Sequence, residues 1–564
     1  MEEIKAQLEK LWYEVSQLKG KLFKYKFSGS QGLTDNITLK SGFLRSGNYS
    51  SSTGWKLTPT SAEINVPTAL KSLDIPDTTT ANSFHVNTAG DAWWGATTFG
   101  AALASISKAG AAIFSNVTAS NIITFQTTVA TSGGDYTTIG AAISAGKKRI
   151  FIRAGTYTEN VAISSDNDYI LIGENKESVI INGTVTIGPA TNDTYVTGTV
   201  STTAGSNVVT GSGTAWLANV VTGNSISIPR SNPNAMAKYK IKSVDSDTQL
   251  TLENPLPATM VAGTNYVVYK HMANFTLSNL TVKDSSGSNV VTFKYTRDII
   301  VTDCIIYNGD ITATSNLAPL AITSGCVNVQ ISNVACSGKT NLTNYAIAVY
   351  HGGSQTQTYS ERLNENVSIS NCTGFARAGF LIDWVRGCHI TNSYFEQAGS
   401  QSTIQQTAGA GGMTTGVAVS NCTFHFGGLI VSPTNFGVEI VGNTFNSIAV
   451  TDLTSIVAQN IDLSRCNFSS NTVYGVAEVI VNGRDVVCIG NIVNANTTNG
   501  IRLTSNASRS IVTGNSCRDN TGTGILIDAS AVSNVVTSNV ALGNSTAQLT
   551  DNGTTTSVNN NVVA

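Results

Sequence analysis

The chain has 564 residues, of which 41% are hydrophobic and 12% are charged, and its formal net charge at pH 7 is −2. This length allows several domains, and the hydrophobic content excludes a chain that is disordered throughout. A nearly neutral chain has no positive field that attracts nucleic acid or an anionic membrane, so neither is expected as a partner. No apolar run reaches membrane-spanning length and the first residues lack the apolar core of a secretion signal, so membrane insertion and ordinary secretion are not expected.

Residues 1–26 predict a coiled-coil oligomerisation stalk. Apolar residues alternate at spacings of three and four, which is the heptad pattern of a helical seam. The seam consists of Ile4, Leu8, Leu11, Val15, Leu18 and Leu22. A single amphipathic helix that packs on its own domain is the alternative, but the narrow and uninterrupted seam favours the coiled coil. The N-termini of several copies should therefore be bundled, although the mixed core residues do not fix their number.

Residues 27–125 predict a β-rich connector, because short alternating segments are separated by turn residues. The segment 54–64, with Gly54-Trp55-Lys56-Leu57 and Ala62-Glu63-Ile64, resembles segments that are common in phage tail-tip and tail-fibre proteins. That resemblance implies a region that attaches to a particle. Trp93 and Trp94 are explained better by contact between subunits than by a ligand platform.

Residues 126–190 predict a capping helix and the first coils of a solenoid. The helix is expected at 140–146, and the sequence Ala154-Gly155-Thr156-Tyr157-Thr158-Glu159-Asn160-Val161 follows it. This arrangement is similar to the start of pectin-lyase-like β-helix proteins, in which a short helix covers the open end of the solenoid. Such a cover is physically required, since a bare end exposes apolar core and unpaired strand edges.

Residues 191–271 lack the solenoid repeat and predict an inserted antiparallel β-module. Strand patterns at 239–244 and 249–253 flank the turn sequence Asp245-Ser246-Asp247. The segment resembles a module that is inserted in other phage tail proteins. The solenoid repeat resumes with Phe275-Thr276-Leu277-Ser278-Asn279.

Residues 272–564 predict the body, a right-handed parallel β-helix. The repeat is an apolar residue, any residue, a second apolar residue, a small residue and Asn, as in 367–371 and 417–421, and it recurs at spacings of about 24 residues near the end of the chain. Alternation at period two and abundant Val, Ile and Thr indicate strands rather than helices. The last position of the repeat is held by Asn279, Asp303, Asn333, Asn371, Asn392, Asn421, Asn443, Arg465, Asn491, Asn515 and Asn539. These amides are expected to point inward and to bond one another along a ladder.

Several positions depart from the repeat. Asp303 and Arg465 break the Asn column, so each is expected to have a local partner or to reach solvent. Glu439 falls in an apolar position, and a bulge at Gly442 that turns Val438 and Ile440 inward explains it better than a buried carboxylate.

The nine cysteines all lie at or after Cys304, and the chain has no cysteine or histidine spacing typical of zinc. Four follow the ladder position on separate coils, too far apart for disulfide bonds: Cys304, Cys372, Cys422 and Cys466. Free thiols are therefore expected, with no metal site and no cofactor.

Pectin-lyase-like proteins include lyases, hydrolases and esterases that act on polysaccharides, but their signature sequences do not occur in this chain. The segment most similar to these signatures is 381–386, where the alternation turns Asp383 outward beside an aromatic ring. The candidate catalytic residues are Asp383, Glu396 and Glu361, and the candidate glycan-binding residues are Trp384, Arg386, His351 and Tyr350. A solvated turn explains these residues more simply than a catalytic site does.

The resemblances together imply a structural receptor-binding protein, a tail fibre or tailspike-like part of a phage virion. It would be a homotrimer, joined through its N-terminal region to other tail or particle proteins, and its β-helix would hold a host cell-surface polysaccharide. Virion parts assemble in the cytoplasm and leave by lysis, which agrees with the missing secretion signal. The alternatives are an active polysaccharide hydrolase or lyase with the same architecture, and a non-viral surface adhesin or filament subunit.

Overall fold

The computed structural model describes Gln7, Lys10, the backbone of eight short strands between Thr38 and Phe114, and most of residues 127–563. The gaps in that last range are 190–192, 229–237, 257–258, 285–288, 310–317, 339–344, 352–362, 398–401, 406–413, 433–435 and 448–460. The chain divides into two compact units, residues 1–123 and residues 124–564. Apart from Gln7 and Lys10, which are helical, the predicted coiled coil lies outside the described residues.

The described strands of the first unit form two antiparallel sheets of four strands each. One sheet consists of β1 (Thr38–Lys40), β2 (Phe43–Arg45), β3 (Gly54–Leu57) and β4 (Ala62–Asn65). The other consists of β5 (Phe84–Val86), β6 (Ala92–Trp94), β7 (Ala104–Ile106) and β8 (Ala112–Phe114).

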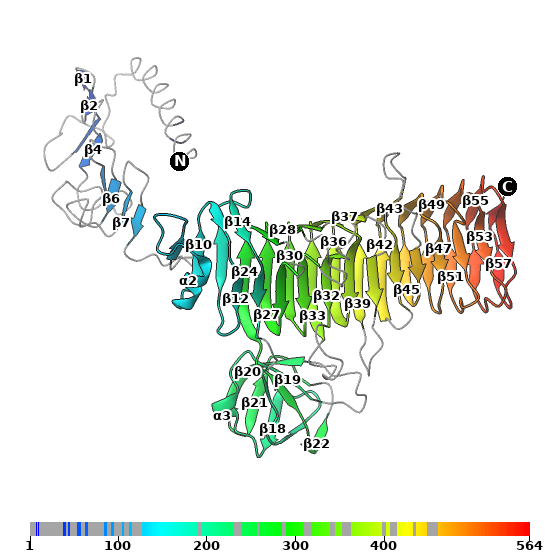
Figure 1. The fold of residues 1–564 in the computed structure, drawn as a ribbon, viewed down its shortest axis with the longest axis horizontal. Coiled ribbons are helices and arrows are strands. Elements are labelled where there is room, and N and C mark those ends of the chain that lie inside the picture. Colours follow the sequence, from blue (N-terminus) through cyan, green and yellow to red (C-terminus); the bar gives the residue numbers. More distant parts are fainter. Residues whose placement is uncertain are drawn as a thin grey trace, which may run out of the picture. The chain divides into compact units, whose positions relative to one another are not determined.

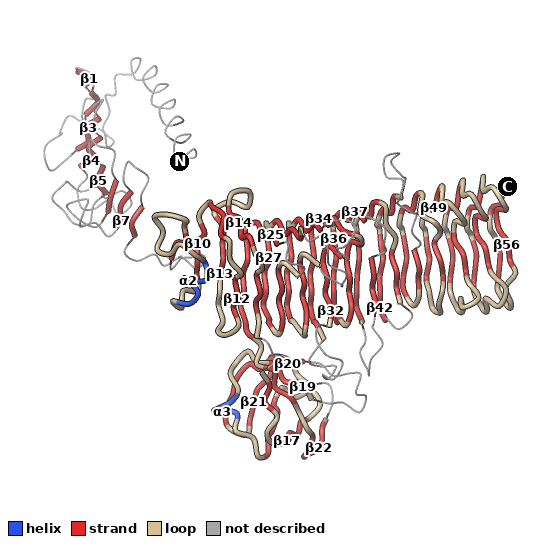
Figure 2. Tube along the Cα trace, viewed as in Figure 1, coloured by secondary structure: helices blue, strands red, loops and turns tan. Residues whose placement is uncertain are grey.

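The second unit is a parallel β-helix, as the sequence predicts. Three parallel sheets of 15, 14 and 13 strands, called sheets 1, 2 and 3 here, run along it, and each coil contributes one strand to each sheet in turn. Figures 1 and 2 show these coils stacked from the first coils to the C-terminus. Because the coil path visits the three sheets in order, a side chain on one strand lies directly above its counterpart on the next coil.

Sheet 1 consists of β9 (Thr127–Val129), β10 (Arg149–Ile152), β13 (Ile170–Gly173), β24 (Met272–Ser278), β27 (Thr296–Thr302), β30 (Val327–Ser332), β33 (Asn364–Ser370), β36 (Val385–Thr391), β39 (Thr415–Ser420), β42 (Phe436–Val441), β45 (Cys466–Ser469), β48 (Val487–Ile489), β51 (Ile511–Thr513), β54 (Val535–Thr537) and β57 (Ser557–Asn559). Sheet 2 consists of β11 (Gly155–Tyr157), β14 (Val179–Asn182), β25 (Thr281–Asp284), β28 (Ile305–Asn308), β31 (Ala335–Gly338), β34 (Thr373–Ala376), β37 (Tyr394–Gln397), β40 (Thr423–His425), β43 (Thr444–Asn446), β46 (Thr472–Tyr474), β49 (Ile492–Asn494), β52 (Ser516–Arg518), β55 (Val540–Leu542) and β58 (Val562–Val563). Sheet 3 consists of β12 (Val161–Ile163), β15 (Val185–Ile187), β26 (Val291–Lys294), β29 (Leu320–Thr323), β32 (Tyr345–Tyr350), β35 (Ala378–Asp383), β38 (Ser402–Gln405), β41 (Leu429–Val431), β44 (Ile461–Leu463), β47 (Val479–Val481), β50 (Ile501–Leu503), β53 (Thr523–Ile527) and β56 (Ala547–Asp551).

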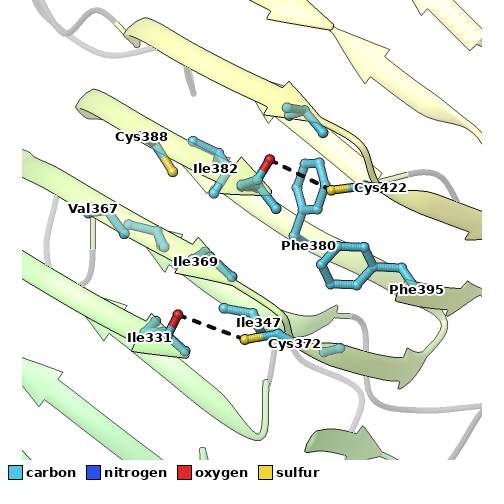
Figure 3. Packing of buried hydrophobic residues seen from close by; sticks show 14 of the residues in the cluster. Ile331, Ile347, Val367, Ile369, Cys372, Phe380, Ile382, Cys388, Phe395 and Cys422 are labelled. Atoms are coloured by element: carbon cyan, nitrogen blue, oxygen red, sulfur yellow. Dashed lines mark hydrogen bonds between the residues drawn. The ribbon is translucent and has the colours of Figure 1, made fainter. Parts of the chain in front are cut away.

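The lumen is a continuous apolar core, because every second residue of each strand points into it. Val and Ile fill most positions, and a column of phenylalanines runs through the middle coils, where the rings of Phe424 and Phe445 stack with centroids 4.7 Å apart. Figure 3 shows this packing around Phe380 and Phe395. Burial of these apolar side chains against their counterparts on successive coils contributes most of the stability of the solenoid.

A short helix, α2 (Ile139–Ser144), covers the lumen at the first coils. Its buried residues Ile139 and Ala142 join the lumen core. The Glu159 carboxylate accepts hydrogen bonds of 2.8 Å from the backbone N–H groups of both Ile139 and Gly140. A carboxylate at a helix N-terminus satisfies free backbone donors, so residues of the predicted "AGTYTENV" coil also fix the cap.

The inserted module leaves the solenoid after β15 and returns at β24. Its antiparallel sheet consists of β16 (Thr194–Tyr195), β17 (Thr199–Thr202), β18 (Val208–Ser212), β19 (Ser225–Ser227), β20 (Lys238–Ser246), β21 (Gln249–Leu252), β22 (Met260–Thr264) and β23 (Val267–Tyr269), and one short helix, α3 (Trp216–Asn219), packs on it. The module has a core of its own, in which the indole N–H of Trp216 donates to the Tyr266 hydroxyl at 2.9 Å. It projects from the side of the stack in Figure 1.

The Asn ladder exists, but its register differs by one residue from the prediction on the earlier coils. On the later coils Asn443, Asn491, Asn515 and Asn539 point inward and are at most 1% exposed, as predicted. On the earlier coils the predicted members, such as Asn371 and Asn421, instead occupy the left-handed turn itself (φ 53° and 54°) and are exposed. The next residue points inward there, so Cys372 and Cys422 take the position that an amide fills later. Asn tolerates left-handed backbone, which is why one residue type serves both positions.

Asn471 belongs to the ladder although the sequence analysis did not include it. Its amide connects Asn443 to Asn491 with hydrogen bonds of 3.1 and 3.0 Å. Arg465 is not in this column, because it lies in the turn between sheets 3 and 1 (φ 46°). Asp303 accepts a hydrogen bond from the Thr302 hydroxyl at 3.0 Å, the local partner that was expected.

Val438 and Ile440 are buried in the lumen and Glu439 is exposed, as predicted. The predicted bulge is absent, because β42 pairs with β39 without a register shift and Gly442 (φ 68°) occupies the turn position that Asn421 holds on the preceding coil.

The prediction of free cysteines is also confirmed. All nine cysteines are free and buried. The Cys372 and Cys422 thiols donate to the carbonyls of Ile331 and Ile390 on the preceding coil, as Figure 3 shows.

Candidate functional site

Asp383 and Trp384 lie at the turn between sheets 3 and 1, at the end of β35. Asp383 points away from the lumen, as its parity predicts, but it is only 2% exposed, and Trp384 is 3% exposed. The outer face of sheet 3 is covered here by a small cluster that includes Leu381, Tyr345 and Tyr350. The structure therefore buries two of the predicted site residues.

Of the neighbouring predicted residues, His351 contacts this turn. His351 Nε2 lies 3.6 Å from an Asp383 carboxylate oxygen, and the imidazole lies 5.1 Å from the Trp384 ring. The Tyr350 hydroxyl accepts a hydrogen bond of 3.2 Å from Asn289. His351, Asp383 and Trp384 thus contact one another and join the turns of adjacent coils, whereas Tyr350 packs with the Leu381 cluster.

Arg386 belongs to a second, charged cluster, where the inserted module meets the same turns. Its guanidinium lies 3.8 Å from Glu365, whose pKa is raised by burial against the opposing effects of Lys238 and Arg386. Lys238, at the start of β20 in the module, donates to the backbone carbonyls of Gly325 and Leu363 at 3.0 Å. These contacts fix the module to the solenoid.

Glu396 lies on a different sheet, on the outer face of β37. It is flanked on adjacent coils by Phe375 and His425, which are its register partners. The Tyr394 hydroxyl lies 3.3 Å from a Glu396 oxygen and 3.4 Å from His425 Nδ1. We call Phe375, Tyr394, Glu396 and His425 the sheet 2 strip. Glu361, the third predicted carboxylate, lies outside the described residues.

The strip is open to solvent and chemically mixed. Phe375 is 36% exposed and Tyr394 is 38% exposed, although both are large aromatic residues. Partial burial, then the nearby Glu396 carboxylate, raises the pKa of Tyr394, so its hydroxyl keeps its proton at neutral pH. The strip presents two ring faces with a carboxylate, an imidazole and a phenol between them, the combination that sugar-binding surfaces use.

Sequence reasoning found Glu396 but missed the other three members of the strip. The signal was present, since Tyr394 and Glu396 flank the inward-pointing Phe395 and must therefore point outward together. Phe375 lies 21 residues before Glu396, and His425 lies 29 residues after it. The repeat is too irregular to predict these two coil lengths, so it does not show that the three residues are neighbours.

A second open surface is a hollow of about 570 Å³ on the outer face of sheet 1, over the first coils. One wall is a column of left-handed residues, in which Asn274 donates to Asp168 at 2.6 Å and Asn328 donates to Asp298 at 2.9 Å. None of the described residues that line this hollow is aromatic. It offers hydroxyl-binding groups, but no ring on which a sugar could stack.

The described part of the chain contains no group of three or more His, Cys, Asp or Glu side chains arranged to hold a metal ion. Within the same residues, no helix is long and apolar enough to cross a bilayer.

A family model described as "Right handed beta helix region" matches residues 408–563. No curated protein sequence matches the chain. The three long parallel sheets, together with this match to the C-terminal coils, show a right-handed parallel β-helix, which confirms the fold predicted for the body of the chain.

Solved structures of similar fold include phage tailspikes. The tailspike protein gp49 from Pseudomonas phage LKA1 is 15% identical, with a TM-score of 0.39 over 76% of this chain and 74% of that chain. The gp54 tailspike of Acinetobacter baumannii bacteriophage AP22, solved in complex with a capsular saccharide, is 12% identical, with a TM-score of 0.35 over 74% and 72%. PfbA, a surface adhesin of Streptococcus pneumoniae, is 11% identical, with a TM-score of 0.32 over 73% and 83%. At these identities the likeness is one of fold alone.

Proposed function

We propose that this chain is the glycan-binding body of a phage tail fibre or tailspike-like protein. It assembles as a homotrimer, attaches to other tail proteins through its N-terminal region, and binds a host cell-surface polysaccharide outside the cell without cleaving it. The observation that carries the proposal is the sheet 2 strip, a rigid outward surface of exposed rings and polar groups on consecutive coils.

The strip suits an extended polysaccharide for two reasons. Its members lie on adjacent strands of one sheet, so the strip follows the long axis of the solenoid, along which a linear chain can lie. Its side chains are positioned by strands whose inner faces are locked into the lumen core, so little ordering is needed on binding.

Binding without cleavage is supported by the placement of the carboxylates. Hydrolysis of a glycosidic bond generally uses two carboxyl groups about 5 to 9.5 Å apart, on either side of the bond. The strip has one carboxylate, Glu396, whereas Asp383 is buried on another sheet.

The proposal is tested with purified capsule or cell-wall polysaccharides from candidate hosts. We expect Tyr394→Ala and Phe375→Ala each to weaken binding about tenfold, because each removes one stacking surface worth about 1–2 kcal/mol. Tyr474→Ala is the matched control, since Tyr474 is 41% exposed on the same row of sheet 2, beyond the strip. Failure of the unsubstituted protein to bind any polysaccharide would contradict the proposal.

One observation favours a second function, an active polysaccharide depolymerase. The Tyr394 hydroxyl contacts both Glu396 and His425, and such a group can move a proton. Sizing the polysaccharide after incubation distinguishes the two functions. Shortened chains that disappear with Glu396→Gln would establish the depolymerase, and unchanged chain length supports binding alone.

A further inference from the structure

The last coils carry rows of apolar residues on their outer faces, where the coils directly before them carry polar ones. On the outer face of sheet 1, Val487, Ile511 and Val535 lie above one another on β48, β51 and β54. The same row holds Glu439 and Asn467 on the two coils before them. These outward residues do not belong to the lumen, which Cys488, Val512 and Val536 fill on the same strands.

A matching change occurs on sheet 2. The two sheets are joined on each coil by the left-handed turn that precedes the ladder position, which we call the ladder turn. Its outer row runs through Thr444 and Thr472 and then becomes Ile492, Ser516, Val540 and Val562. Ile492 is 47% exposed and Val562 is 55% exposed, and Ile511 and Val535 across the turn are 41% and 39% exposed. We call these two rows flank 1 (Val487, Ile511, Val535) and flank 2 (Ile492, Val540, Val562).

The turn between the flanks has no side chain on two coils, and on the next coil it holds only the small Ser538. Gly490 and Gly514 occupy its left-handed position (φ 64° and 66°), where exposed Asn371, Asn392 and Asn421 stand on earlier coils. A Cβ atom at Gly490 would meet no other atom within 4 Å, so space beyond the turn is open. Another backbone can therefore approach this edge closely.

Contiguous apolar side chains on a surface mark a contact site, since exposure to water is unfavourable for them. One flat partner can cover only one flank of a convex turn. Two neighbours cover both flanks if flank 1 of each copy packs against flank 2 of the next, which is a closed head-to-tail ring of three or more chains. The heptad seam of residues 4–22 predicts parallel association of identical chains, in which the same coils of each copy lie at the same height.

We propose that flank 1 of one copy packs against flank 2 of the next copy, so that the C-terminal coils of the protein associate as a ring around their ladder turns. This contact deepens the homotrimer of the proposed function and is independent of glycan binding. It gives the oligomer a second point of attachment, far along the chain from the heptad seam.

Introduced cysteines test the contact in the full chain, because all nine native cysteines are buried. Chains with Val535→Cys and chains with Val540→Cys are produced together and treated with a short thiol-to-thiol cross-linker. We expect covalent dimers from the mixture and almost none from either variant alone, since like flanks do not meet in a ring. Equal cross-linking of Val535→Cys chains alone, or no cross-linking of the mixture in an assembled oligomer, would overturn the proposal.

Charge on flank 1 gives a second measurement. The double variant Ile511→Asp and Val535→Asp should abolish the cross-links and weaken association about 100-fold or more, because carboxylates would be buried without partners. Thr550→Asp, on the outer face of β56 in sheet 3 and thus on the same coils, should change neither. A monomeric unsubstituted protein would overturn the homotrimer together with this contact, whereas an oligomer that the charges leave unchanged would overturn the contact alone.

Discussion

One residue in each coil, directly after the left-handed turn between sheets 1 and 2, decides how that turn is held. The thiol of Cys422 contacts the Ile390 carbonyl at 3.6 Å, whereas the amide of Asn443 donates to the equivalent Val419 carbonyl at 2.9 Å. The amide also accepts from the Cys422 backbone N–H, again at 2.9 Å. An Asn therefore satisfies two buried backbone groups where a Cys satisfies one weakly, so the later coils are more firmly closed.

This difference predicts a large effect of Asn491→Ala. Asn491 accepts from the backbone and side chain of Asn471 and donates to Phe468 and Asn515, all within 3.0 Å. Its removal leaves a buried N–H and a buried carbonyl unpaired, so we expect the free energy of unfolding to fall by about 2–4 kcal/mol. Denaturant unfolding followed by circular dichroism measures the change.

Asn421→Gly is the control for the ladder, because Asn421 is exposed in a left-handed turn that glycine also adopts. We expect a change within about 0.5 kcal/mol. Equal destabilisation by the two substitutions would show that the ladder position has no special role.

His271 gives the stability of the protein a defined pH dependence. It is 3% exposed, stacks on Tyr269, and has no hydrogen-bond partner for either ring nitrogen among the described residues. Burial, and then the positive charges of Lys238 and Arg297, hold the pKa of His271 well below its ordinary value of 6.5. The unfolded chain therefore binds a proton below about pH 6.5 that the folded chain does not, and stability falls as the pH falls below that value.

His271→Phe should remove this pH dependence of stability while keeping an aromatic ring stacked on Tyr269. Between pH 6.5 and 5.5 we expect the variant to lose about 1 kcal/mol less stability than the unsubstituted protein. Thermal unfolding at several pH values measures it, and His389→Phe, at an exposed site on β36, is the control. Identical pH slopes for His271→Phe and the unsubstituted protein would exclude His271 as the source.

At the scale of strands and turns, period-two alternation was sufficient to predict the architecture. The inward residues of a coil, such as Val367 and Ile369, are the ones that the alternation selects, because a lumen admits only every second side chain. The turn was harder to predict. Asn suits both a left-handed turn and a buried ladder, so the same letter at Asn421 and at Asn443 has two structural meanings.

The candidate site shows a second limit of sequence reasoning. Alternation correctly turned Asp383 away from the lumen, but it cannot show that side chains such as Leu381 and Tyr345 cover the outer face of sheet 3 there. Grouping Glu396 with Asp383 failed for the same reason, since neighbours in a solenoid are set by coil length and not by distance along the chain. Exposure and lateral neighbours are properties of the assembled stack.

At the scale of the whole molecule, the inserted module is an addition to a solenoid that continues without it. β13 pairs directly with β24, with Leu171 opposite Leu277, although the module separates them in the sequence. On the next coil, where no module is inserted, the same turn from sheet 3 to sheet 1 consists of Tyr295 alone, between β26 and β27. The sheet therefore does not depend on the module for its register.

This continuity predicts the result of deleting the module. Joining Pro189 directly to Lys270 should leave a folded β-helix with an unchanged strand signal in far-ultraviolet circular dichroism. Its stability should fall only modestly, by about 1–3 kcal/mol, because the Lys238 bonds to Gly325 and Leu363 are lost and Glu365 loses a nearby positive charge. Charge removal alone, with Lys238→Met in the full chain, should reproduce much of that loss, whereas Lys240→Met, which removes only a partly exposed ion pair with Glu253 inside the module, should not. A deletion variant that fails to form the β-helix would show instead that the module is required to start or hold the stack.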